Sequence, residues 1–442
     1  MHTKYTNGEI WKVAYPILIS LIMEQLIGMT DTAFMGRVGE VELGASAIAG
    51  VYYLAIFMLG FGFSIGSQIL IARRNGEGNF RMIGSIFYQG IYFLLGMALV
   101  MFTLSRLFSP WILSHLVASP RICEAAVSYI NWRVFGFFFS FVAIMFRAFF
   151  VGTTQTKTLT LNSIVMVTSN VVFNYILVFG KLGFPALGIA GAAIGSSLAE
   201  LVSMLFFIVY TTRKVDCAYG LNQLVSFRWA ELKRIMSVSL WTMIQNAVSI
   251  STWFLFFIFI EHLGERSLAI TNIVRNVSSI PFMTITAFAS TCSSLVSNLI
   301  GSGEARYVML TIRQHVRLCT CIVWPVILLI ACLPTYVLRI YTDMPDLVEA
   351  AVPTLWVLCS SYLFQCAGFI FFQSVSGTGD TRSAFLLEIV ALTCYLIFIV
   401  TVILLLKMDV AVCWFAEHVY AGAIGLLSYL YLKKGSWQRK QI

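Results

Sequence analysis

An acidic side chain, Asp31, lies inside the first long apolar segment of the chain, between Pro16 and Gly36. An ionised carboxylate in hydrocarbon costs from roughly 3 to more than 10 kcal/mol, so such residues persist mainly where they bind, pair or exchange protons. Asp31 is therefore our first candidate for a functional residue, one that binds a ligand, pairs with another charge or exchanges protons. The alternative is a helix-end acid held by backbone amides, because Arg37 and Gly39 follow within two turns.

A second acid, Glu24, precedes Asp31 by seven residues, which places both on nearly the same face of a helix. A like charge at this spacing favours protonation of one of the two carboxyl groups. Glu24 is a second candidate proton-exchanging residue on this ground. Its alternative role is an internal ion pair with Arg147, which lies inside the fourth apolar segment.

Two amides, Asn170 and Asn174, lie four residues apart in the fifth apolar segment and therefore project from one helix face. Burial favours the neutral form of a carboxyl group, whereas amide donors favour its charged form. Amides beside an acid can thus set proton exchange near physiological pH. The alternative is that these amides only join helices, since amides hydrogen-bond across membrane helices in any case.

The elements that must position these side chains are membrane helices. Hydrophobic residues make up 59% of the 442 residues and charged residues only 11%. Continuous apolar runs, each long enough to cross about 30 Å of hydrocarbon, exclude a soluble core and the alternating pattern of a β-barrel. The predicted spans are 13–36, 45–72, 84–105, 125–151, 159–180, 187–211, 236–260, 268–299, 311–334, 350–375, 384–406 and 410–432. We predict an all-α integral membrane protein with twelve transmembrane helices.

The distribution of basic residues predicts the orientation of these helices. Of the 29 Lys and Arg residues, 19 fall in alternate loops on one side and only seven on the other. The seven are Arg37, Arg106, Arg121, Lys181, Arg266, Arg339 and Lys407. The positive-inside rule then places both termini in the cytoplasm. The net charge of +9 is a topology signal plus attraction to anionic lipid, so no nucleic-acid partner is needed to explain it.

The chain lacks the residues that intramembrane catalysis or a structural metal requires. It has no HExxH or CxxC motif, and its five histidines are dispersed. We expect no enzyme activity, no cofactor and no metal, and the ten cysteines are expected to pack as small apolar side chains. The N-terminus has no cleavable leader pattern, so the first span is expected to be retained.

An internal repeat appears when the chain is aligned with itself at an offset of 225 residues. Gly39-Glu40 then matches Gly264-Glu265, and Gly152-Thr153 matches Gly377-Thr378 far along the chain. Such a repeat indicates an internal duplication, and six helices per repeat give both halves the same direction. We predict an N-terminal lobe (1–211), a cytoplasmic linker (212–235) and a C-terminal lobe (236–442). This organisation is typical of a transporter, and the alternative is a duplicated scaffold protein.

Pro16 lies near the start of the first span. Proline removes a helix hydrogen bond and can bend a membrane helix when neighbouring groups satisfy the freed carbonyl. We interpret Pro16 as a candidate hinge. The alternative is a proline that the helix merely tolerates.

These features together resemble the multidrug and toxic compound extrusion (MATE) family, particularly its NorM- and DinF-like bacterial members. Three motifs carry the resemblance over the whole chain by their order and spacing. They are Pro16 with Asp31-Thr and Met35-Gly-Arg-Val-Gly39, then Gly183-Phe-Pro-Ala-Leu-Gly188-Ile-Ala-Gly-Ala-Ala193, and finally Gly377-Thr-Gly-Asp-Thr-Arg382.

The resemblance implies a secondary antiporter that exchanges amphipathic, often cationic compounds for H⁺ or Na⁺. It implies that the first-helix acid is Asp31, that the fifth helix contributes Asn170 and Asn174, and that the sixth contributes a hydroxyl at Ser196. Several relatives have a second acid where this chain has Asn174, which argues against tight Na⁺ binding here.

In Na⁺-coupled relatives the C-terminal lobe carries acids in the seventh and tenth helices, and the matching positions here are about Ser249 and Gln365. That site is therefore expected to be absent, with coupling confined to the N-terminal lobe. The other charges at membrane depth in this half, Arg275, Glu388 and Glu417, are interpreted as a structural network, the alternative being a polar lining.

The sequence thus predicts a proton-coupled multidrug antiporter of a bacterial inner membrane, acting as a monomer on small-molecule drugs or toxic compounds. The rival is a lipid-linked oligosaccharide flippase of similar architecture. Flippases of this kind usually line their cleft with basic residues, whereas only Arg147, Arg275 and Arg133 lie at depth here.

Overall fold

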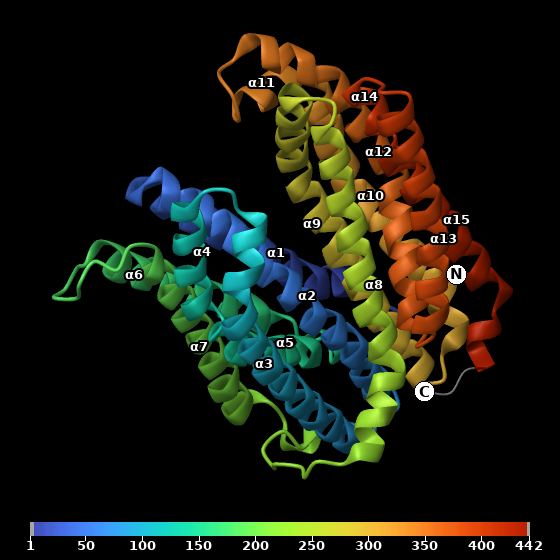
Figure 1. Cartoon of the computed structure of the whole chain (residues 1–442). Coiled ribbons are helices and arrows are strands. Elements are labelled where there is room, and N and C mark those ends of the chain that lie inside the picture. The colour runs from blue at the N-terminus through green and yellow to red at the C-terminus, as the bar shows by residue number, and fades with distance from the viewer. Residues whose placement is uncertain (1–3, 440–442) are drawn as a thin grey trace. The chain divides into compact units, whose positions relative to one another are not determined.

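The computed structural model describes residues 4–439; its regular elements are helices joined by loops, with no strand among the described residues (Figure 1). The helices of the first half are α1 (Asn7–Val38), α2 (Glu40–Gly76), α3 (Phe80–Leu116), α4 (Pro120–Arg133), α5 (Gly136–Gly152), α6 (Lys157–Phe179) and α7 (Ile189–Lys214). Those of the second half are α8 (Trp229–Glu261), α9 (Glu265–Gly301), α10 (Val308–Cys332), α11 (Pro334–Arg339), α12 (Pro345–Gly377), α13 (Thr381–Ile399), α14 (Val410–Cys413) and α15 (Ala416–Lys434).

The predicted set of membrane spans is confirmed in number and order. In the described residues, 11 helical segments are long and apolar enough to cross a membrane. The pair α4 and α5, bent by 53° at a short break, makes the twelfth span when counted as one. Each predicted apolar run lies within one of these segments or closely overlaps it, because a bilayer about 30 Å thick demands about 20 apolar residues at each crossing.

The internal repeat is visible in the helix bounds. Adding the offset of 225 residues to α2 gives the bounds of α9, and both helices have 37 residues. The same offset carries the bent pair α4 and α5, from Pro120 to Gly152, onto the continuous helix α12. The two halves therefore share one plan, and the first half differs by the break after Arg133.

The chain forms two compact units. One runs over Ile19–Met243, and the other combines the residues up to Leu18 with those from Ile244 onward. The start of α1 belongs to the second unit, where Ile10 and Ala14 join its apolar core. The boundary follows Pro16 by two residues, yet α1 is one unbroken helix across it. The predicted boundaries of the linker, at 211/212 and 235/236, stay a prediction. The outermost residues of the two predicted lobes, including the basic residue Lys440, lie outside the described residues.

Within the first unit, α6 packs against α7, and α2 packs against α3, α4 and α5. In the second unit, α12 contacts α9, α10 and α15, while α13 lies beside α15. Figure 1 shows α12, α13 and α15 as neighbouring helices in that unit. These packings bring together the polar side chains considered below.

The contact between α6 and α7 depends on a glycine. A Cβ atom on Gly191 would lie 2.5 Å from the carbonyl oxygen of Leu177, so only a residue without a side chain lets the two backbones approach this closely. The close packing of α6 against α7 thus has a direct physical cause at Gly191.

We expect Gly191→Ala to destabilise the protein by about 1–3 kcal/mol, because the added methyl group forces α6 and α7 apart. Gly96→Ala is the matched control: Gly96 is also helical, and nothing lies within 4 Å of its added Cβ. Thermal unfolding of the two purified variants measures the difference. A Gly191→Ala variant as stable as the control would contradict this packing.

Candidate functional site

Asp31 lies in a cluster of uncharged hydrogen-bond donors in the first unit. Its Oδ1 atom accepts a hydrogen bond from Asn174 Nδ2 at 2.6 Å, and its Oδ2 atom accepts one from Ser196 Oγ at 3.3 Å. Asn170 Nδ2 donates to Ser196 Oγ at 3.2 Å, and Asn174 Nδ2 also lies 3.3 Å from Asn170 Oδ1. The structure therefore brings together four of the predicted site residues from three helices.

Local features of α6 and α7 position these donors. The four-residue spacing of Asn170 and Asn174 puts both amides on the α6 face that meets α7, where they are buried. On α7, Gly195 has no Cβ, which leaves room for the Asn174 side chain in contact with it. Gly180 ends α6 in a left-handed conformation (φ 68°), which glycine adopts at little cost, and returns the chain towards α7.

A second polar group lies near Asp31 but is internally neutralised. Arg133 makes two hydrogen bonds to Glu200, at 2.8 Å and 2.6 Å, and the Tyr53 hydroxyl donates to the same carboxylate at 3.0 Å. The guanidinium carbon of Arg133 lies 3.7 Å from the centre of the Tyr53 ring. Arg133 also interacts electrostatically with Asp31, while no ion pair joins Asp31 to any described residue.

Glu200 and Tyr53 are functional candidates that the sequence analysis missed. Glu200 lies inside the sixth apolar run, so the signal that selected Asp31 applies to it equally. Tyr53 carried no comparable signal, because a tyrosine in an apolar helix is ordinary. Its role becomes visible only through its contacts with Glu200 and Arg133.

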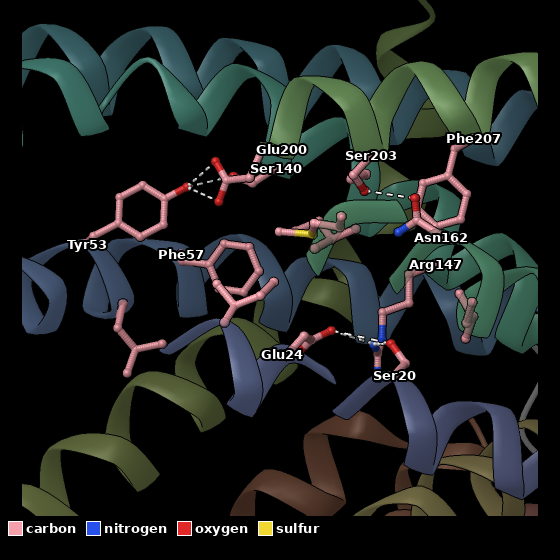
Figure 2. Close-up of a pocket in the computed structure, with 16 residues that line it drawn as sticks. Ser20, Glu24, Tyr53, Phe57, Ser140, Arg147, Asn162, Glu200, Ser203 and Phe207 are labelled. Atoms are coloured by element: carbon pink, nitrogen blue, oxygen red, sulfur yellow. Dashed lines mark hydrogen bonds and ion pairs between the residues drawn. The ribbon is translucent and has the colours of Figure 1, made fainter. Parts of the chain in front are cut away.

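A cavity of about 210 Å³ lies beside this group, within the first unit. Figure 2 shows the Glu24–Arg147 pair and the Tyr53–Glu200 pair as separate groups around it. Apolar side chains supply most of the wall. The remaining lining residues are Ser20, Ile27, Leu54, Phe57, Ser140, Ala143, Ile144, Leu159, Asn162, Met166, Ser203 and Phe207. The cavity suits a small amphipathic molecule, being mainly apolar with a few charged groups.

Glu24 does not join the hydrogen-bonded cluster around Asp31. Its carboxylate pairs with Arg147 Nη1 at 3.2 Å, which is the alternative recognised from the sequence. Ser20 lies within 3.4 Å of the same Arg147 nitrogen. Glu24 thus faces the cavity as half of an ion pair held by a single contact.

The remaining predicted residues lie in the second unit. Pro16 is buried inside α1 and belongs to that unit, apart from the Asp31 cluster. Glu388 accepts hydrogen bonds from Ser249 and Tyr420, and Glu417 accepts one from Gln365. The Arg275 guanidinium lies over the rings of Trp253 and Phe257. All ten cysteines are free, and among residues 4–439 no group of three or more His, Cys, Asp or Glu side chains is arranged to hold a metal ion.

Comparison with known proteins gives consistent similarities. Residues 16–176 and 242–404 match the family model described as MatE. A probable multidrug resistance protein NorM of Thermotoga maritima is 22% identical over 440 residues, covering 98% of this chain and 94% of that protein. The multidrug resistance protein MdtK of Photorhabdus laumondii is 24% identical over 389 residues, covering 85% and 83% of the two chains.

Solved structures share the fold of the chain. A crystal structure of MATE in complex with MaD3S has a TM-score of 0.88 at 17% identity, covering 98% of this chain and 97% of that one. The eukaryotic MATE transporter AtDTX14 has a TM-score of 0.86 at 16% identity, covering 98% and 96%.

Proposed function

The chain belongs to the MatE family of membrane transporters, and from this premise we propose that it is an antiporter that expels amphipathic compounds in exchange for protons. The names of its NorM and MdtK relatives support multidrug efflux. The proposed location is a bacterial inner membrane, and the proposed working unit is a monomer.

One observation carries the proposal for the coupling step. Asp31 is held by the neutral donors Asn174 and Ser196, and no ion pair neutralises it within the described residues. A carboxylate neutralised by Arg or Lys has little reason to take up a proton, whereas an unpaired one in an apolar helix gains from doing so. The two acids that line the cavity, Glu24 and Glu200, are each paired with an arginine and are poorer candidates.

Protonation of Asp31 would change the contacts between α1 and the pair α6 and α7. The charged carboxylate accepts from Asn174 and Ser196 together, and the protonated form is a weaker acceptor that also carries a donor. We propose that this change lets α1 bend about Pro16 and alters the cavity, so that proton and substrate binding oppose each other. Linkage then requires that bound substrate weakens the proton affinity of Asp31 by the same factor as the proton weakens the affinity for substrate.

The cavity supports an amphipathic cation as the exported compound. Aromatic and aliphatic side chains such as Phe57 and Phe207 offer apolar contact, and Glu24 offers a carboxylate held by only one contact with Arg147. The flippase alternative needs free basic side chains for an anionic lipid head group. Both arginines of this region, Arg133 and Arg147, are instead paired with acids.

A proton fits this site better than Na⁺, because Asp31 accepts from the Asn174 amide and the Ser196 hydroxyl, and no second carboxylate joins these contacts among residues 4–439. The test is substrate-driven proton flux in proteoliposomes, with NaCl or choline chloride as the salt. We expect equal flux in both salts. Flux that appears only with Na⁺ would reject the proton assignment while leaving antiport intact.

We expect residues 212–235 to face the cytoplasm, as the count of 19 against seven basic residues predicts. The measurement is labelling of Ser226→Cys, an exposed position, in a background from which the ten native cysteines have been removed, with a reagent that cannot cross membranes. Labelling is expected in inverted vesicles and not in intact cells, and Asp343→Cys in an opposite loop should show the reverse. Labelling of Ser226→Cys from outside intact cells would contradict the orientation.

A further inference from the structure

The chain between α7 and α8 follows α3 and is fastened to it by side chains of that helix (Figure 1). We call residues 217–229 of this connection the strap. The Tyr88 hydroxyl donates a hydrogen bond to the carbonyl oxygen of Leu221, and the Tyr92 hydroxyl donates one to that of Val225 at 2.6 Å. The two tyrosines are four residues apart, so they share the face of α3 that the strap follows.

Two further contacts hold the strap against α3. The buried Gln89 side chain donates from Nε2 to the carbonyl oxygen of Ser226 at 2.8 Å, and its Oε1 atom accepts from the backbone N–H of Arg228 at 3.0 Å. A Cβ atom on Gly84 would lie 2.6 Å from the carbonyl oxygen of Tyr219, so the two backbones touch where the strap begins. The strap is therefore an ordered part of the first unit, although most of it has no regular secondary structure.

The strap extends alongside the apolar part of α3. Tyr92 lies eight residues inside the apolar run that begins at residue 84, or about 12 Å along the helix. Backbone without regular structure is tolerated at membrane depth only where protein groups satisfy its hydrogen bonds. Side chains of α3 do so here for three carbonyl groups and one N–H group of the strap. These contacts suit a segment at the boundary between lipid head groups and hydrocarbon.

The outer surface of the strap is apolar. Leu224 is 83% exposed, Phe227 55% and Trp229 68%. The ring centre of Phe227 lies 6.5 Å from that of Trp229 and 6.3 Å from that of Tyr92. A group of exposed apolar side chains is uncommon on a surface that faces water and marks a site of contact with a partner or a membrane. Tryptophan and tyrosine are the residues enriched where membrane meets water.

Basic side chains flank this apolar surface. Four of them are exposed and form no ion pair within the part of the chain that the structure describes, namely Arg213 and Lys214 at the end of α7 and Lys233 and Arg234 early in α8. The nearby acids are already engaged, because the Asp216 carboxylate accepts from the Ala218 N–H group and Glu231 pairs with Arg228. The flanks therefore carry positive charge that attracts anionic lipid at a membrane surface.

We propose that the strap is a membrane-interface anchor that binds anionic phospholipid of the cytoplasmic leaflet. In this arrangement Leu224, Phe227 and Trp229 lie among the upper acyl-chain segments, and the four flanking basic side chains contact head-group phosphates. The anchor fixes the depth at which the first unit sits in the membrane. Lipid binding does not depend on the proposed antiport, whereas the choice of leaflet rests on the proposed orientation of residues 212–235.

The depth of the strap can be measured on the full-length protein in nanodiscs of phosphatidylcholine and phosphatidylglycerol. A spin label is attached to Leu224→Cys after removal of the ten native cysteines, and its collisions with oxygen, which enters lipid, are compared with those of a water-soluble nickel complex. The control is Asn79→Cys, an exposed position directly before α3. We expect oxygen to be favoured several-fold at 224 and the nickel complex at 79. Equal access of the nickel complex to both positions overturns the anchor and indicates a surface for a soluble partner.

Lipid selectivity is read at the same position with a fluorescent label quenched by brominated lipid. We expect brominated phosphatidylglycerol to quench at least about fivefold more effectively than brominated phosphatidylcholine, the factor that one Lys or Arg near an anionic surface supplies. A label on Leu99→Cys, an exposed position in the apolar part of α3, should show no preference. The preference at 224 should be lost when Arg213, Lys214, Lys233 and Arg234 are changed to glutamine. Equal quenching by the two lipids at 224 overturns the proposed binding of anionic lipid.

A second measurement keeps the native cysteines, so it decides the proposal even if their removal prevents folding. Phosphatidylglycerol should raise the unfolding temperature of the wild type above that in phosphatidylcholine, and should raise that of the four-glutamine variant by less than half as much. The matched control changes four exposed basic residues of the opposite loops to glutamine and should keep the wild-type shift; they are Arg37, Arg121, Lys181 and Arg339. The same shift in all three proteins contradicts lipid binding by the flanks of the strap.

Discussion

Asp31→Asn is expected to abolish proton-driven accumulation of substrate against a gradient. One proton moving through about 100 mV contributes about 2.3 kcal/mol, and one pH unit adds about 1.4, which together sustain a substrate concentration ratio of several hundred at most. Without the carboxyl group at position 31 that ratio should fall to about one. Asparagine keeps nearly the same volume, so folding and insertion should persist. Transport assays in proteoliposomes and drug resistance of expressing cells measure the loss.

Asp343→Asn makes the same chemical change in an exposed loop and should leave transport unchanged. Calorimetry in two buffers of different ionisation enthalpy adds a second readout. Substrate binding to the wild type should release protons, and Asp31→Asn should release about one fewer. Wild-type efflux by an Asp31→Asn protein at normal expression would falsify the proposed coupling site.

Glu200→Gln is expected to lower the free energy of unfolding by about 3–5 kcal/mol. The substitution leaves the Arg133 guanidinium buried without its bidentate partner, and uncompensated buried charge is the costly outcome of breaking such a pair. The Tyr53 hydroxyl also loses a charged acceptor. Thermal unfolding in detergent, followed by intrinsic fluorescence or by the folded fraction on size exclusion, measures the effect.

Glu24→Gln is the matched control, because Glu24 also pairs with an arginine in the same unit. Its side chain is 54% exposed against 7% for Glu200, and its pair rests on a single 3.2 Å contact. Water-accessible pairs of this kind are worth about 1 kcal/mol or less. Equal stability losses in the two variants would contradict the assignment of Arg133–Glu200 as the buried, stabilising pair. A Glu200→Gln variant as stable as the wild type would indicate that Arg133 re-pairs with nearby Asp31.

The number and order of the membrane helices followed from the sequence alone. Hydrocarbon excludes unsatisfied backbone groups and sets a minimum apolar length. Each membrane span therefore appears in the sequence as an apolar run, which can be recognised without knowing which helices pack against it. The internal duplication could also be recognised from the sequence, and the bounds of α2 and α9 differ by the same offset of 225 residues. Asp31 could be identified as a candidate because a charge in an apolar run is conspicuous wherever the helix lies.

The tertiary structure alone decided which acids are neutralised. Glu24 pairs with Arg147 and Glu200 with Arg133, across 123 and 67 residues, while Asp31 accepts hydrogen bonds from the neutral donors Asn174 and Ser196. Helical spacing predicted that Asn170 and Asn174 share a face, but the identity of the facing helix depends on packing between distant segments. The same holds for Ser249 and Gln365, whose side chains donate to Glu388 and Glu417 on other helices. Charge pairing depends on distance in three dimensions, which spacing along one helix does not determine.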